Sequence, residues 1–249
     1  MTNTKKVAVI SGGMGGVGRA TATALAHEHY RVVVLYRHSP EEELAAARTS
    51  LPGESIFIRC DISDEEDAVR AIHEVLSKTG RIDIAIHTAV DPIKRERMLD
   101  MDAAEFRSQF EAGFFGAFNF FRPITKAMKE QKSGTLIGIT SSVIEADSTA
   151  ARMGAYTVAK IALRGLLREL HRELSPSGIR VMAVAPHLMR TKLNADLPEK
   201  FFEMAAGPSG KEPLMTPEDV AGAIIRLCTD TTVPSGVSYL VSSSTRTPL

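Results

Sequence analysis

Short apolar runs alternate with amphipathic stretches along most of the chain. Strands that are covered on both faces are almost continuously apolar, whereas strands with one solvent face alternate apolar and polar residues. Seven runs rich in valine, isoleucine and leucine have the first pattern: residues 6–10, 31–36, 55–60, 82–87, 134–140, 179–185 and 236–241. Strands that alternate with helices form parallel sheets with right-handed crossovers. The sequence therefore predicts an α/β fold, a doubly wound parallel sheet of about seven strands with helices on both faces.

Two of the predicted helices have recognisable ends. Ser63 and Glu66 have the spacing of a capping box at the start of one helix, and Gly80 is placed to end it. Thr216, followed by a proline and then by Asp219, predicts the start of another helix near the C-terminus.

Length and charge narrow the class of protein. A chain of 249 residues, 44% of them hydrophobic, is sufficient for one domain over residues 1–249. Thirty basic and thirty acidic residues leave no net charge, which argues against nucleic acid or a membrane surface as partner and favours small molecules or protein. No apolar stretch of signal or membrane-spanning length begins the chain, so we expect a cytoplasmic location. Cys60 and Cys228 have no metal-ligand spacing around them, and we expect reduced core residues and no metal.

A glycine-rich segment, SGGMGGVGRA at residues 11–20, lies between the first predicted strand and the first helix. Gly12, Gly16 and Gly18 allow a tight turn, close approach of a diphosphate to the backbone, and tight helix packing. A flexible loop is the alternative, but the position between strand and helix favours a dinucleotide site.

The residues that follow the second and third strands suggest which dinucleotide binds. An NAD site usually presents a carboxylate after the second strand, whereas this chain has Tyr36 and Arg37. A guanidinium suits a ribose phosphate, so we expect NADP(H) in preference to NAD(H), unless Arg37 is merely solvated. Asp61, after the third strand, is placed either to receive the adenine amino group or to cap a helix.

Tyr156 and Lys160 stand four positions apart in the segment GAYTVAK. In a helix these two side chains lie on the same face, one turn apart. An ammonium group near a phenol favours the phenolate and lowers the pKa of the phenol, which makes proton exchange at neutral pH more efficient.

Together, the glycine turn, the Asp61 turn and the Tyr156–Lys160 pair resemble the short-chain dehydrogenase/reductase family over essentially the whole chain, with its Rossmann fold. Within it the chain looks most like ketoreductases of the 3-oxoacyl-carrier-protein reductase type. The resemblance implies that Tyr156 is the acid and base, that Lys160 tunes it and holds the nicotinamide ribose, and that Ser142 holds the substrate carbonyl. It also implies these cofactor-binding residues: Gly12, Gly16, Val17, Gly18, Tyr36, Arg37, Asp61, Ile62, Ala89, Tyr156, Lys160, Pro186 and Thr191.

The chain departs from the family pattern at several positions. His87 and Val90 belong to HTAV, which stands where the family has Asn-Asn-Ala-Gly, and His187 replaces a glycine after the sixth strand. Gly113 stands at the position of the family's catalytic asparagine, so proton exchange with solvent is either slower or supported by water. Each histidine is either a general acid or a neutral residue that fills volume.

Two functions remain open on this basis. One is an NADP-dependent carbonyl reductase of a ketone, such as a 3-oxoacyl or polyketide-type thioester. The other is a weakly active or inactive subunit that assembles with an active paralogue. The apolar segment 187–216 is the expected substrate lid. A helix apolar on more than one face predicts a homodimer or homotetramer, with a hetero-oligomer as alternative; its phenylalanines are Phe106, Phe110, Phe114, Phe115, Phe118, Phe120 and Phe121.

Overall fold

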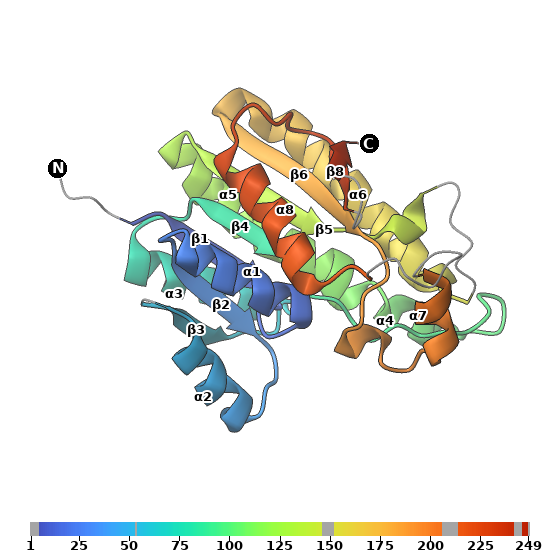
Figure 1. The fold of residues 1–249 in the computed structure, drawn as a ribbon. Coiled ribbons are helices and arrows are strands. Elements are labelled where there is room, and N and C mark those ends of the chain that lie inside the picture. Colours follow the sequence, from blue (N-terminus) through green and yellow to red (C-terminus); the bar gives the residue numbers. More distant parts are fainter. Residues whose placement is uncertain (1–4, 53, 146–151, 206–213, 242–245, 249) are drawn as a thin grey trace.

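One twisted sheet forms the centre of the molecule (Figure 1). The computed structural model describes residues 5–52, 54–145, 152–205, 214–241 and 246–248. The strands of this part of the chain are β1 (Val7–Ser11), β2 (Arg31–Tyr36), β3 (Ile56–Arg59), β4 (Ile84–His87), β5 (Gly134–Ile139), β6 (Ile179–Pro186), β7 (Ser238–Val241) and β8 (Arg246–Pro248). Their order is β3-β2-β1-β4-β5-β6-β7-β8.

The first seven strands are parallel, and β8 pairs antiparallel with β7. The predicted doubly wound sheet of about seven strands is therefore confirmed, with β8 as an addition. Strand order reverses between β1 and β4, and a ligand of such a sheet binds outside the carboxyl ends of the strands at this point.

Helices cover both faces of the sheet, as expected for buried parallel strands (Figure 1). Their bounds are α1 (Gly16–His27), α2 (Glu41–Ser50), α3 (Glu65–Thr79), α4 (Ala103–Ser108), α5 (Gly116–Gln131), α6 (Gly154–Leu174), α7 (Glu199–Ala205) and α8 (Pro217–Thr229). Helices α1 and α8 pack on one face, and α3, α5 and α6 pack on the other, so that two apolar layers enclose the sheet.

The helix ends agree with the sequence in two of three cases. Gly80 ends α3 with a φ of 72°, and Thr216 and Asp219 form a capping box at the start of α8. The expected capping box of Ser63 and Glu66 is wrong. The cap of α3 is Asp64, whose carboxylate accepts the amide of Asp67 at 3.0 Å, because the helix begins one residue later than predicted.

Several short elements lie beyond the carboxyl ends of the strands. In Figure 1, α4 and α7 lie together past the ends of β5 and β6. The π-helical turn η1 (Glu111–Phe115) precedes α5, and the 3₁₀ turns η2 (Ser142–Ile144) and η4 (Lys192–Asn194) follow β5 and β6; a further 3₁₀ turn, η3 (Ser175–Ser177), follows α6. In the described part of the chain, no helix combines the length and apolarity needed to span a bilayer.

Candidate active site

The glycine-rich turn after β1 is fixed by close backbone contacts. Gly12 has a φ of 67°, and a Cβ atom on it would lie 2.6 Å from the Cα of Ala89, two residues after β4. A Cβ atom on Gly18 would lie 2.4 Å from the carbonyl oxygen of Gly12. Thr88 closes the turn from the other side, because its Oγ1 donates to the carbonyl oxygen of Ser11 at 2.7 Å. At Gly12 and Gly18, only glycine fits without displacing neighbouring backbone.

The turn leads directly into the N-terminus of α1. The cap residue, Gly15, supplies no side-chain hydrogen bond to the helix, so its first amides are free to bind an anion. Val17 is partly buried on this first turn. Gly16 faces the segment after β6, with the Cγ2 atom of Thr191 3.4 Å from a Cβ built on it, and Pro186 ends β6. The predicted turn and the predicted Thr191 segment are thus neighbours.

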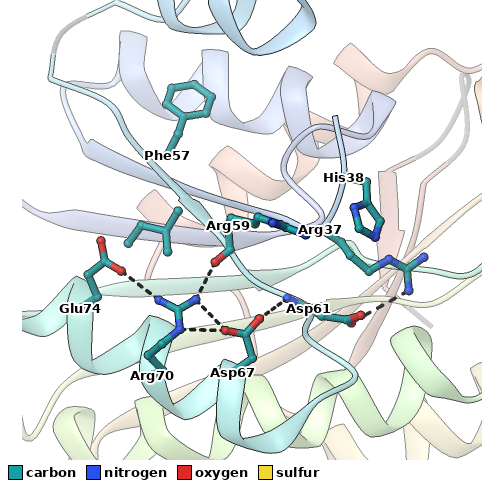
Figure 2. A pocket seen from close by; sticks show the side chains of 9 residues that line it. Arg37, His38, Phe57, Arg59, Asp61, Asp67, Arg70 and Glu74 are labelled. Atoms are coloured by element: carbon teal, nitrogen blue, oxygen red, sulfur yellow. Dashed lines mark hydrogen bonds and ion pairs between the residues drawn. The ribbon is translucent and has the colours of Figure 1, made fainter. Parts of the chain in front are cut away.

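The residues after β2 and β3 meet at one edge of the site. Tyr36 ends β2, and the guanidinium of Arg37 lies 4.0 Å from the carboxylate of Asp61 and 3.9 Å from that of Asp91 (Figure 2 shows the contact with Asp61). The Asp91 side chain is only 12% exposed, and its Oδ2 accepts the amide of Ala112 in η1 at 2.7 Å. Burial raises the pKa of Asp91. Asp91 was missed from sequence, although an acid directly after HTAV is a visible signal.

Beside Arg37, a hollow opens over the ends of β2 and β3 (Figure 2). Arg70 lines this hollow and donates hydrogen bonds to the carboxylates of Asp67 and Glu74 and to the carbonyl oxygen of Arg59. Asp67 in turn accepts the backbone amide of Asp61 at 2.7 Å. This network fixes the turn that carries Asp61. The hollow is lined by Arg37, His38, Phe57, Ile58, Arg59, Asp61, Asp67, Arg70 and Glu74, and Ile62 is buried next to them.

Tyr156 and Lys160 lie on the buried face of α6, as their spacing predicted. Tyr156 is 7% exposed and Lys160 is 4% exposed. The Lys160 Nζ atom donates to the carbonyl oxygen of Ile139 at 2.7 Å, and it lies 5.6 Å from the centre of the Tyr156 ring. The end of β5 therefore holds the ammonium group next to the phenol.

Of the two adjacent serines, Ser141 lies close enough to the Tyr156 phenol for its hydroxyl to lower the pKa of that group, which favours Ser141 over the predicted Ser142. Thr140, one residue earlier, is turned back to the carbonyl oxygen of Val184, and Ser142 begins η2. Ser141 precedes Tyr156 by fifteen residues, and Ser142 precedes it by fourteen.

The pKa of the Tyr156 phenol is raised above its usual value: burial, the largest effect, raises it, and the nearby Ser141 hydroxyl and the charge of Arg95 lower it. The net lowering of this pKa that was expected from the Tyr156–Lys160 spacing is therefore wrong for the free protein. Burial also lowers the pKa of Lys160 to about 8, and the charge of Asp91 acts in the other direction. Arg95 was not expected from sequence, since it lies in the loop after β4, far from the Tyr156–Lys160 motif.

His87 is a buried neutral residue. It is fully enclosed, and its Nδ1 atom lies 2.8 Å from the Ser11 hydroxyl. Burial and the charge of Lys160 lower the pKa of His87 to about 3. A proton donor at neutral pH needs a higher pKa, so the structure favours the volume-filling alternative for His87. His187, in contrast, is exposed.

Gly113 is buried within η1, beside His87. A Cβ atom built on it would meet no described atom within 4 Å, so this position has room for a side chain. The His87 Nε2 atom has no well-aligned hydrogen-bond partner among the described residues, although the backbone of Ala112 and Gly113 lies close enough to act weakly on its pKa. The space beside Gly113 is therefore large enough for a side chain and borders the polar Nε2 atom of His87.

The predicted lid is described up to Ala205 and again from Leu214, and its residues 206–213 lie outside the described part. Met189 and Met215, at its two ends, form an isolated parallel bridge. Arg190 pairs with Glu199 within the lid. Phe201 and Met204, on α7, are 51% and 69% exposed.

The two cysteines are free, as predicted. Cys60 is buried and Cys228 is partly buried, and burial raises the pKa of each thiol to about 12. Among the described residues, no group of three or more histidine, cysteine, aspartate or glutamate side chains is placed to hold a metal ion.

Comparison with known proteins agrees with this geometry. Residues 12–237 match the family model described as enoyl-(acyl carrier protein) reductase. A 3-oxoacyl-[acyl-carrier-protein] reductase of Synechocystis sp. is 31% identical over 239 residues, which cover 91% of this chain and 90% of the relative. A 3-alpha-(or 20-beta)-hydroxysteroid dehydrogenase of Mycobacterium bovis is 27% identical over 241 residues, 96% of this chain and 89% of the relative.

A solved structure extends the comparison to the fold. The 3-ketoacyl-(acyl-carrier-protein) reductase of Brucella melitensis, complexed with NADH, superimposes with a TM-score of 0.85 at 25% identity, covering 95% of this chain and 96% of that one. The residues that the family model matches include the glycine turn from Gly12, the Tyr156–Lys160 helix and the segment after β6. The chain belongs to the short-chain dehydrogenase/reductase family of oxidoreductases.

Proposed function

We propose that the protein reduces a ketone to an alcohol with NADPH, and that Tyr156 donates the proton. The observation that carries this proposal is the placement of Tyr156 and Lys160 on the buried face of α6, with the Lys160 Nζ atom 5.6 Å from the centre of the Tyr156 ring and bound to the end of β5. The similarity to a 3-oxoacyl-carrier-protein reductase favours a 3-oxoacyl or polyketide-type thioester as substrate. No observation in the described residues favours the alternative of an inactive structural subunit.

The residues around the glycine turn fit a dinucleotide. The turn is tight because Gly12 and Gly18 lie so close to neighbouring backbone that a Cβ atom on either would collide with it. The start of α1 has no side-chain cap and can offer its backbone amides to a diphosphate. Asp61 and Ile62 would flank the adenine, and Ala89, Pro186 and Thr191 would face the nicotinamide half.

Arg37 would bind the ribose phosphate that distinguishes NADPH from NADH. Arg37 directly follows β2, and neither it nor Tyr36, the last residue of the strand, is the aspartate or glutamate that an NAD site usually presents there. Asp61 and Asp91 lie at the outer limit of ion-pair distance from Arg37, at 4.0 and 3.9 Å, so its charge is partly compensated. The positive charge of Arg37 therefore favours NADPH over NADH, and the two nearby carboxylates make this preference smaller.

When bound, the dihydronicotinamide supplies a hydride to the carbonyl carbon, and negative charge develops on the carbonyl oxygen. Ser141 and Tyr156 would hold this oxygen by hydrogen bonds that exist before the reaction. Tyr156 would then transfer its phenolic proton to the oxygen, and the Lys160 ammonium group would stabilise the phenolate that remains. Lys160 would also hold the nicotinamide ribose.

Apolar side chains around the site suit a hydrophobic substrate. Leu99 is 92% exposed and Met98 is 44% exposed in the loop after β4, and the apolar Phe201 and Met204 on α7 are exposed as well. Substrate binding would cover such side chains, which is the expected role of a lid.

The proposal also includes self-association of the protein. Of the seven phenylalanines, Phe120 and Phe121 are buried in the core, whereas Phe115 and Phe118 are 48% and 43% exposed. Val158 and Ile161 on α6 are exposed too. Association through α5 and α6 into a homodimer or homotetramer would cover these side chains, and size-exclusion chromatography with light scattering measures the number of copies.

The proposed activity is tested in two steps. NADPH fluorescence first measures binding of the cofactor, and loss of the reduced-nicotinamide absorbance then measures turnover with a panel of ketones and 3-oxoacyl thioesters. We expect turnover with at least one 3-oxoacyl thioester and tighter binding of NADPH than of NADH. Binding without turnover across the whole panel would reject the reductase and favour the inactive subunit.

A further inference from the structure

Residues 189–196, which follow β6, cross the carboxyl edge of the sheet, and we call them the strap. The Lys192 Nζ atom of the strap lies 2.9 Å from the carboxylate of Glu43 on α2, 149 residues away in the chain. Helix α2 follows β2, and the strand order places β1, β4 and β5 between β2 and β6. The Glu43–Lys192 contact therefore spans the point between β1 and β4 where the strand order reverses and where a ligand of such a sheet binds.

The middle of the strap lies against the first turn of α1. The Cγ2 atom of Thr191, the residue before Lys192, is 3.4 Å from a Cβ atom built on Gly16. Gly16 begins α1, and its cap residue leaves the first amides of this helix free for a diphosphate. The strap therefore borders the place where the diphosphate of a dinucleotide would bind.

Other contacts hold the strap at both of its ends. Met189 forms a parallel bridge with Met215, just before α8. At the other end, Arg95 of the loop after β4 donates to the Asn194 amide oxygen at 2.7 Å and to the Asp196 carboxylate at 2.8 Å. The Arg95 side chain is only 15% exposed, and Asn194 is buried. These ends are therefore fixed to the body of the protein by groups with little access to water.

The contact with α2 is of a different kind. The Lys192 side chain is 90% exposed, and the Glu43 side chain is 35% exposed. An ion pair so open to water is weak and is screened by salt, so it can break without disturbing the fold. A weak contact over a crevice can hold a ligand in place and still permit its release.

We propose that the Glu43–Lys192 ion pair fastens the strap across the dinucleotide crevice, so that both are positioning residues that slow the release of bound cofactor. This inference rests on the proposed function, because it takes the ligand of the crevice to be a nicotinamide dinucleotide. Both residues act through the strap, without contact with the cofactor. The pair affects NADPH and NADH equally, because both carry the diphosphate.

The dissociation rates of NADPH and NADH, measured by stopped-flow fluorescence, test this proposal. Glu43→Gln removes one charge of the pair, and we expect both nucleotides to leave about two- to fivefold faster. Glu43→Lys places like charges opposite one another and should accelerate release further. A direct action of these charges on the anionic cofactor predicts the opposite sign, because both variants make the crevice more positive.

Exchange of the two charges restores the pair in reverse. Lys192→Glu alone should accelerate release, whereas the double variant Glu43→Lys with Lys192→Glu should return to within about twofold of the unmodified protein. Glu41→Gln is the matched control, with the same change of charge on the same helix. Glu41 pairs with Arg48 within α2 at 3.0 Å, so its loss should leave release unchanged.

Hydrogen exchange of the backbone amides of the strap gives a second readout, in the protein without nucleotide. We expect faster exchange in Glu43→Gln than in Glu41→Gln. Unchanged or slower release in Glu43→Gln would overturn the proposal, and so would a double variant that releases as fast as Lys192→Glu alone. If the unmodified protein binds neither nucleotide, the proposed function fails, and hydrogen exchange alone decides on the strap: equal exchange in the two glutamine variants would overturn it.

Discussion

The two halves of the site differ in which part of the chain forms them: the glycine turn that would bind the cofactor is made of backbone, whereas the reaction side is made of the side chains of Tyr156 and Lys160. On the cofactor side, backbone fixes the geometry: Gly12 and Gly18 lie so close to neighbouring main chain that no side chain fits. On the reaction side, the chemical groups belong to side chains: Tyr156 and Lys160 lie on the buried face of α6, and the Lys160 ammonium group is held by the carbonyl oxygen of Ile139. A site made of backbone tolerates no added atoms, whereas a site made of side chains can be tuned by exchanging them.

This difference explains where the chain departs from the pattern of its family. The glycine turn keeps the family spacing, and the departures at His87, Gly113 and His187 lie on the reaction side or next to it. At Gly113 there is open space for a side chain, and at Gly18 there is none. We therefore expect substitutions on the two sides to change different quantities, binding on the first and rate on the second.

The largest effect on binding is expected from Gly18→Val. Its side chain would start 2.4 Å from the Gly12 carbonyl oxygen, so the turn must open and the amides at the start of α1 must move. We expect NADPH affinity to fall by roughly 100-fold, about 2.7 kcal/mol. Fluorescence titration measures it. Gly165→Ala, on α6 with no atom near its Cβ position, is the control and should bind normally. Normal binding by Gly18→Val would contradict the backbone account of this side.

Arg37→Gln should change the choice between cofactors. Loss of a charged hydrogen bond costs about 1.5–3 kcal/mol, so NADPH affinity should fall by roughly 10- to 100-fold while NADH affinity stays nearly constant. Arg59→Gln, at an exposed side chain of the same hollow, is the matched control. Equal losses for both cofactors would show that Arg37 does not contact the ribose phosphate.

Binding should also depend on pH through Lys160. Its pKa is lowered to about 8 in the free protein, so the ammonium is present below that pH and is lost as pH rises through it. If the ammonium holds the cofactor, NADPH affinity is constant below pH 8 and falls above it, by at most about tenfold per pH unit. Lys160→Met should bind more weakly and lose this dependence, and an unchanged dependence would assign it to another group.

The smallest effect is expected at Gly113. Gly113→Asn would return an amide to the open space beside His87, and one additional hydrogen bond of about 0.7 kcal/mol corresponds to about threefold in kcat. Steady-state kinetics in H₂O and D₂O measure both the rate and its dependence on proton transfer. Gly113→Ala fills part of the same space without an amide and should not increase kcat. An increase in both variants would mean that filling the space is sufficient.

Much of the fold and part of the site could be predicted from the sequence. The continuous apolar runs predicted the seven parallel strands, and the spacing of Tyr156 and Lys160 correctly placed both on one buried face of α6. These features depend on local periodicity, which a sequence displays directly.

Other residues could not be predicted, because their roles depend on contacts between distant segments or on loop length. The choice between Ser141 and Ser142 depends on which hydroxyl lies nearer the Tyr156 phenol, and sequence spacing alone does not show this. Arg95 donates a hydrogen bond to Asn194, which is 99 residues away in the chain, and no local pattern indicates such a contact. Asp91 acquires its role through an amide of η1, a π-helical turn that no local pattern predicted.

The central claim, that Tyr156 supplies the proton while backbone holds the cofactor, is tested most directly by Tyr156→Phe. The measurement pairs NADPH affinity, from fluorescence, with the rate of NADPH oxidation in a single turnover against a ketone reduced by the unmodified protein. We predict unchanged affinity, within about twofold, and a rate reduced by roughly 100-fold or more, as expected for loss of a general acid. A rate within a few-fold of the unmodified protein, at unchanged affinity, would contradict the account.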